Sequence, residues 1–248
     1  MKLLKKFAVC LFGCISLVGI SHAMPAKMGQ NLIVNGNAES DGIGSRHGAD
    51  VIPGWVTQQQ GVAVVAYGSQ AHLPSIQHSQ QIHGGRQFFA GGTMKDTVLE
   101  QFIDLSDYSS WIDQGIARFV ASGWFGGLLD KNDAAGVSFT FLNAQQDIVS
   151  YRLGDIDAFA RHGKTGFVFQ DLTELIPIGA TQLMVTVGFN QMGGDYNHGY
   201  ADNLFFSVNV VPAPASWVLV LSGFLAAAAL STQYRPSPSQ IKEPGLVG

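Results

Sequence analysis

The sequence predicts an all-β domain in which two sheets pack face to face. Between residues 31 and 211 no convincing amphipathic helix appears, and short runs rich in Val, Phe, Thr and Ile recur between Gly, Asp and Asn. Apolar and polar residues alternate within these runs, as at Val137, Phe139 and Phe141, so each strand buries one face. Two one-sided sheets protect those faces by packing together, which makes a β-sandwich.

Strands are predicted, in order, at 31–35, 62–67, 86–90, 97–105, 117–124, 136–142, 148–153, 166–171, 182–189 and 201–210. Residues 69–85 are Gln-rich and flanked by glycine, and we expect a loop there. Residues 172–176 are a candidate for a short helical turn that Pro177 limits. No internal repeat or shift in composition divides the segment, so 31–211 is expected to be one domain after a short leader, 24–30.

The first 23 residues are typical of a secretory signal peptide. Lys2, Lys5 and Lys6 precede an apolar run at 7–20, and small residues stand at −3 and −1 of a cut after Ala23. The run would span only ~21 Å as a helix, short of a ~30 Å hydrocarbon layer, which disfavours a membrane anchor. Both cysteines lie within this segment, so the mature chain is expected to have no disulfide.

The C-terminal segment, 212–235, predicts a membrane span with a sorting motif. Residues 215–232 are apolar on every side and would reach ~27 Å as a helix. Pro212 and Pro214 precede them and Arg235 follows, an order that resembles the PEP-CTERM sorting signal. The resemblance implies an exosortase-type sorting enzyme as a partner, although Ala213 replaces the usual Glu and Arg235 stands alone. A plain C-terminal anchor is the alternative, and 236–248 is expected to be a disordered tail.

Charge and motifs exclude several functions. Residues 24–211 hold nine Lys and Arg against 17 Asp and Glu, a net charge of about −8 that argues against nucleic acid as a partner. No Gly-x-Ser-x-Gly elbow, His-Glu-x-x-His helix or phosphate loop is present. His72, His78 and His83 match no metal-ligand spacing. The sequence therefore predicts no catalytic site.

Three motifs resemble galactose-binding-like jelly rolls, which occur in many carbohydrate-binding modules. They are 31–39 with the Pro-Gly-Trp at 53–55, the Phe- and Trp-rich run 119–127, and the closing run 199–206. The resemblance implies a jelly-roll fold and a structural Ca²⁺ site at Glu39 and Asp202, where the first and last strands meet. Asn37, Asn203 and backbone carbonyls would complete its shell. The alternative is that Asp202 bonds backbone amides and Glu39 faces solvent.

Candidate ligand-binding residues are Trp55, which follows a Pro-Gly turn, and the polar loop residues Asp195, Asn197 and His198. Trp124 lies in a Phe-rich run that favours the core. We therefore expect a non-catalytic protein that binds carbohydrate or exopolysaccharide. It would be exported, held transiently in the inner membrane, and then displayed at the cell surface or in the matrix. A structural or adhesive surface protein is the alternative, and a small polysaccharide-active enzyme is less favoured.

Overall fold

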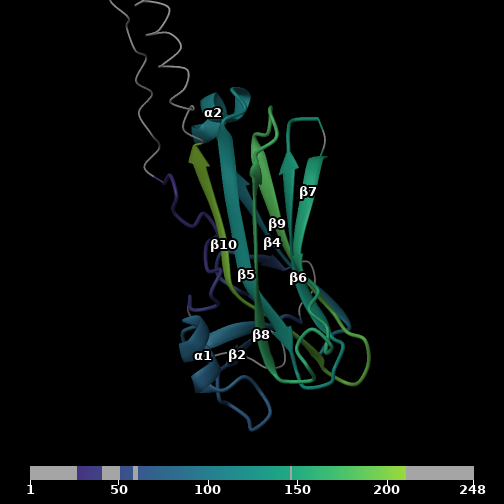
Figure 1. Cartoon of the computed structure of the whole chain (residues 1–248). Coiled ribbons are helices and arrows are strands. Elements are labelled where there is room, and N and C mark those ends of the chain that lie inside the picture. The colour runs from purple at the N-terminus through teal and green to yellow at the C-terminus, as the bar shows by residue number, and fades with distance from the viewer. Residues whose placement is uncertain (1–26, 41–50, 58–60, 146, 211–248) are drawn as a thin grey trace, which may run out of the picture.

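The computed structural model describes residues 27–40, 51–57, 61–145 and 147–210, and it confirms an all-β architecture of two antiparallel sheets (Figure 1). The predicted signal peptide lies outside these residues, as does the C-terminal segment with Pro212, Pro214 and Arg235. Over the described ranges, no helix combines the length and the apolar character that a membrane crossing requires.

Each sheet has five strands. The first sheet has the order β1-β4-β9-β6-β7, and the second has the order β2-β3-β10-β5-β8. The bounds in the first sheet are β1 Val56–Thr57, β4 Asp96–Asp104, β9 Gln182–Asn190, β6 Ala134–Leu142 and β7 Asp147–Gly154. Those in the second are β2 Ala63–Ala66, β3 Gln87–Gly92, β10 Asn197–Val210, β5 Ala117–Gly127 and β8 Gly166–Leu175.

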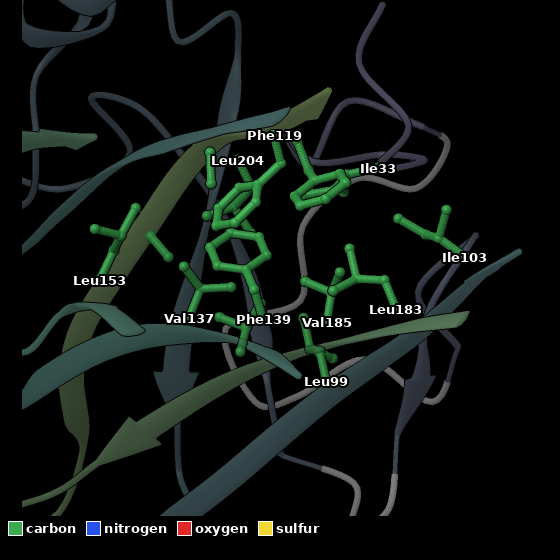
Figure 2. Packing of buried hydrophobic residues seen from close by; sticks show 14 of the residues in the cluster. Ile33, Leu99, Ile103, Phe119, Val137, Phe139, Leu153, Leu183, Val185 and Leu204 are labelled. Carbon is green, nitrogen blue, oxygen red and sulfur yellow. The ribbon is translucent and has the colours of Figure 1, made fainter. Parts of the chain in front are cut away.

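The main core lies between the two sheets (Figure 2). Phe206 of β10 stands at its centre, with its ring centroid 5.4 Å from Phe119 and 5.6 Å from Phe139. Val137, Phe139 and Phe141 all point inward, as the alternation in the sequence predicts. Burial of such rings stabilises the fold by about 1.5–3 kcal/mol each, so the sandwich rests on this interface.

A second, smaller core covers part of the outer face of the second sheet. Helix α1, Ile76–Ile82, contributes Ile82, which packs with Phe88 of β3 and Tyr200 of β10. Ser75 caps the helix, because its hydroxyl accepts from the backbone N–H of His78. The prediction of a loop over 69–85 was therefore wrong at this helix, whose seven residues are too few to show helical periodicity. A short 3₁₀ turn, Ser106–Tyr108, and α2, Ser109–Asp113, lie at the other end of the sandwich.

Two further predictions of local structure were wrong. Residues 31–35 do not form a strand, because the segment turns and Asn35 adopts a left-handed backbone with φ of 53°. The segment still lies beside β10, since the N–H groups of Gly29 and Leu32 donate to the carbonyls of Val208 and Phe206. Residues 172–175 continue β8 instead of turning into a helix, because the ladder with β5 overrides the weak local preference.

A bulge in β10 shapes the outer surface of the second sheet. Its register with β5 shifts between Asp202 and Phe205, and Asn203 takes a left-handed φ of 50°. Leu204 consequently joins the main core, and the bulge changes which side chains the strand presents on each face.

Candidate functional site

A cleft of about 430 Å³ opens beside the β10 bulge. We call it the aromatic cleft, and its lining residues are Asn31, Ile33, Asn35, Gly36, Asn37, Ser122, Trp124, Phe169, Asn203, Leu204 and Phe205. They come from the N-terminal segment, the bulge and the neighbouring strands β5 and β8. The cleft therefore depends on four pieces of chain that are distant in sequence.

Trp124 and Phe169 form the aromatic side of this cleft. They are register partners across β5 and β8, and their ring centroids lie 5.3 Å apart with planes inclined at 54°. Phe169 is 48% exposed and Trp124 is half-buried. The expectation of a core position for Trp124 was wrong in part, since it packs against the small outer cluster and lines the cleft. An exposed ring of this kind offers an apolar face for stacking.

The opposite wall is the N-terminal segment, and two of its asparagines hold it in place. Asn31 donates through Nδ2 to the Leu204 carbonyl and accepts through Oδ1 from the Phe206 N–H. Asn35 donates to the Pro53 carbonyl. Gly36 allows the closest approach, because a Cβ there would lie 2.3 Å from the Leu204 carbonyl oxygen. These amides are structural, since Asn31 fixes the wall to β10 and Asn35 fixes it to the segment that carries Pro53.

Other polar groups in the cleft have no such role. Among the described residues, no hydrogen bond engages the side chains of Asn37 and Ser122, the Nε1 of Trp124 or the Oδ1 of Asn203. Asn37 is exposed, whereas Ser122 and Asn203 are half-buried. The cleft thus combines an aromatic surface with several polar groups that a ligand can reach.

The predicted calcium ligands Glu39 and Asp202 both lie against the dipeptide Gly84-Gly85. A Cβ at Gly84 would lie 2.6 Å from Oδ2 of Asp202, and one at Gly85 would lie 2.6 Å from Oε1 of Glu39. Glu39 accepts from the N–H groups of Arg86 and Gln87 at 2.6 and 2.7 Å and pairs with the Arg86 guanidinium at 3.1 Å.

Asp202 is fully buried, and its contacts are hydrogen bonds. Its Oδ2 accepts from the Tyr67 hydroxyl at 2.5 Å and its Oδ1 accepts from the Asn203 N–H at 2.7 Å. Burial raises the pKa of Asp202 well above its usual value, and the negative charge of Glu39 raises it further, although both hydrogen bonds act in the opposite sense. Burial also raises the pKa of Tyr67, and so does the Asp202 charge.

These residues offer a partial donor set for a cation. Two carboxylates and a phenol are hard oxygen ligands, but Ca²⁺ takes six to eight of them. Within the described ranges, no cluster of three or more His, Cys, Asp or Glu side chains is arranged to hold a metal. The two predicted amide ligands do not complete the set: Asn203 donates through Nδ2 to the Ile82 carbonyl, and Asn37 lines the aromatic cleft. Backbone carbonyls would have to supply most of any calcium shell.

None of the four predicted ligand-binding residues is among those that line the aromatic cleft. Trp55 is only 7% exposed, and its Nε1 donates to the Asn35 carbonyl, so it belongs to the main core. Asn197 is buried and donates to the Lys95 carbonyl. Asp195 is exposed and His198 half-buried at the start of β10. Six residues of strand, roughly 20 Å, separate Asn197 from Asn203.

A buried carboxylate fixes the loop that carries Asp195 and His198. Asp133, which is 1% exposed, accepts from the Met192 N–H at 2.8 Å and from the His198 N–H at 2.9 Å. Arg161 holds the facing loops, since its guanidinium donates to three backbone carbonyls, those of Leu129, Lys131 and Lys164. Both side chains build the end of the sandwich that holds the β5–β6, β7–β8 and β9–β10 loops.

Neither a family model nor a curated protein matches this chain. Among solved structures, a family 16 carbohydrate-binding module is 17% identical, with a TM-score of 0.44, over 71% of this chain and 99% of that one. A family 61 carbohydrate-binding module in complex with β-1,4-galactotriose is 15% identical, with a TM-score of 0.40, over 73% and 99%.

An enzymatically active domain of tailspike protein 4 from bacteriophage CBA120 is 18% identical, with a TM-score of 0.41, over 72% of this chain. This chain spans only 21% of the tailspike chain's own length.

Proposed function

We propose that this protein binds carbohydrate, without catalysis, in the aromatic cleft. The observation that carries the proposal is the exposed Phe169 ring beside Trp124, faced by polar groups that have no partner within the described residues. Sugars present apolar C–H faces and hydroxyl edges, so they pair with rings on one side and with amide, hydroxyl or indole groups on the other.

The composition of the cleft also supports a role in binding. Glycoside hydrolysis requires two carboxyl groups that flank the scissile bond. None of the described residues lining the cleft is an Asp or a Glu, so they offer a ligand no acid and base of that kind.

We propose as well that the protein is exported and reaches the cell surface or matrix through its C-terminal segment. The support is in the sequence alone, namely the signal peptide pattern and the PEP-CTERM-like order of Pro212, Pro214, an apolar run and Arg235. An exosortase-type enzyme would act on that segment. This placement would present the cleft to extracellular polysaccharide.

A Ca²⁺ ion at Glu39 and Asp202 is a further part of the proposal. Its support is the buried Asp202 carboxylate, which has a second carboxylate nearby and no cationic partner among the described residues. An ion that binds only the folded state must raise the midpoint of unfolding. Thermal unfolding of residues 24–211 in Ca²⁺ and in EDTA tests this, and equal midpoints would remove calcium from the proposal.

The binding proposal is tested by affinity electrophoresis against a panel of soluble polysaccharides. Replacement of Phe169 by Ala removes an exposed ring from the cleft and should abolish retardation. Phe159→Ala is the matched control, because Phe159 is 89% exposed on a loop outside the cleft and should bind as the parent does.

If the parent is retarded by no polysaccharide, or if both variants bind equally, the proposed site is wrong. Capture of a surface protein by a chain that ignores every polysaccharide would favour the alternative, a structural or adhesive protein.

A further inference from the structure

The charge of the aromatic cleft bears on which polysaccharide it accepts. Among the described residues, its lining consists of aromatic, aliphatic, amide and hydroxyl side chains and includes no Lys, Arg or His. Proteins that recognise a carboxylate or sulfate ordinarily place a guanidinium or ammonium group against it. A bound acidic sugar would lose water in this cleft without gaining a counter-charge, which is unfavourable.

The exposed charged residue that pairs across the strands with a residue of the cleft lining is an acid. Asp171 of β8 is exposed and is the register partner of Ser122, one of the lining residues. Arg118 lies four residues before Ser122 on β5, roughly 13 Å away by strand geometry. Arg86 is paired with Glu39. Among the described residues, the local field therefore opposes an anion.

The polar groups without partners have the mixed character that hydroxyls require. Trp124 Nε1 is a donor, Asn203 Oδ1 is an acceptor, and the Ser122 hydroxyl and the Asn37 amide are both. A sugar hydroxyl donates and accepts, so it can satisfy either kind of group. A carboxylate only accepts, and it would leave Asn203 Oδ1 without a donor because the Nδ2 of that side chain is held by the Ile82 carbonyl.

We propose that the aromatic cleft selects uncharged polysaccharides, built of neutral hexose or pentose units, over chains that bear uronate or sulfate groups. This inference rests on the proposed function of the same cleft. It adds that discrimination arises because no cationic side chain lines the cleft among the described residues, and because Asn203 Oδ1 can only accept a hydrogen bond.

The test uses polymers that share a backbone and differ in charge. The first pair is methyl-esterified polygalacturonan and its de-esterified form, and the second is a soluble β-1,4-glucan oligosaccharide and its C6-carboxylated counterpart. Neutral arabinoxylan, galactomannan and β-1,4-galactan complete the panel. We expect at least tenfold tighter binding to the uncharged member of any pair that binds. Binding of neutral polymers should not change between 50 and 500 mM NaCl, since no ion pair contributes to it.

A variant that introduces a positive charge keeps the inference falsifiable. Asn37→Lys places an ammonium group at the exposed rim and should raise affinity for the acidic member of a pair at low salt, whereas Asn37→Gln should not. Phe169-dependent binding that is equal or tighter for the acidic member would overturn the inference and leave the proposed function standing. Binding that survives Phe169→Ala, or no binding to any polymer, would overturn both.

Discussion

Removal of the Asp133 carboxylate should destabilise the domain strongly without changing the aromatic cleft. In the native structure this buried side chain accepts two backbone hydrogen bonds, from Met192 and His198. A hydrogen bond to a charged acceptor contributes about 1.5–3 kcal/mol, and deletion leaves two N–H groups that the loop can only partly expose to water. We therefore expect Asp133→Ala to lower the free energy of unfolding by about 3–5 kcal/mol.

Urea unfolding followed by tryptophan fluorescence measures this loss, and the thermal midpoint should fall by roughly 10 °C. Asp130→Ala is the matched control, because it removes an exposed aspartate from the same loop and should cost less than about 0.5 kcal/mol. Asp133→Asn retains one acceptor oxygen, so its loss of unfolding free energy should lie between those of Asp133→Ala and Asp130→Ala. If Asp133→Ala and Asp130→Ala unfold at the same urea concentration, the carboxylate does not fix these loops and our account of that end is wrong.

Two other predictions concern the outer layer of the second sheet. In EDTA, Asp202→Asn should gain stability relative to the parent as pH rises from 4 to 8. The raised pKa of Asp202 makes its contribution complete below the unfolded value of about 3.9 and lost as pH passes through the folded value. A pH-independent difference between the two proteins would contradict that shift. Ser75→Ala removes the capping oxygen of α1, so it should lower the free energy of unfolding by about 1 kcal/mol and accelerate amide exchange in this helix. Ser69→Ala, at an exposed site, should change neither quantity.

The sequence was informative wherever structure is local or periodic. The alternation at Val137, Phe139 and Phe141 placed β6 and its inward face correctly, because a half-buried strand requires that pattern. Helix α1 was missed, because its seven residues hold too few apolar positions to distinguish a helix from a loop. The left-handed backbone of Asn35 interrupts the expected first strand, which shows that a resemblance in sequence does not fix backbone conformation there.

The candidate site was harder to predict because it is assembled from distant residues. Trp124 and Phe169 meet only through the pairing of β5 with β8, and no spacing along the chain reports that register. The bulge at Asn203 depends equally on how β10 pairs with its neighbours. Trp55 was predicted to bind ligand because it follows a Pro-Gly turn. It lies in the core instead, and its indole N–H donates to the Asn35 carbonyl. Trp124 and Phe169 are visible in the sequence as aromatic residues, but recognising them as a binding surface required knowledge of which face of the sheet is solvated.

The hydrogen bond from Gly29 to Val208 places the entry and exit of the domain side by side. A polypeptide that enters and leaves at one point can be joined end to end through a short linker, reopened at an exposed turn, or inserted whole into a loop of another protein. Such rearrangements would preserve the order of strands in both sheets, provided that residues 29–37 remain part of the domain. A chain that starts after residue 37 would retain both sheets and lose one wall of the cleft, so an engineered binder must preserve those nine residues.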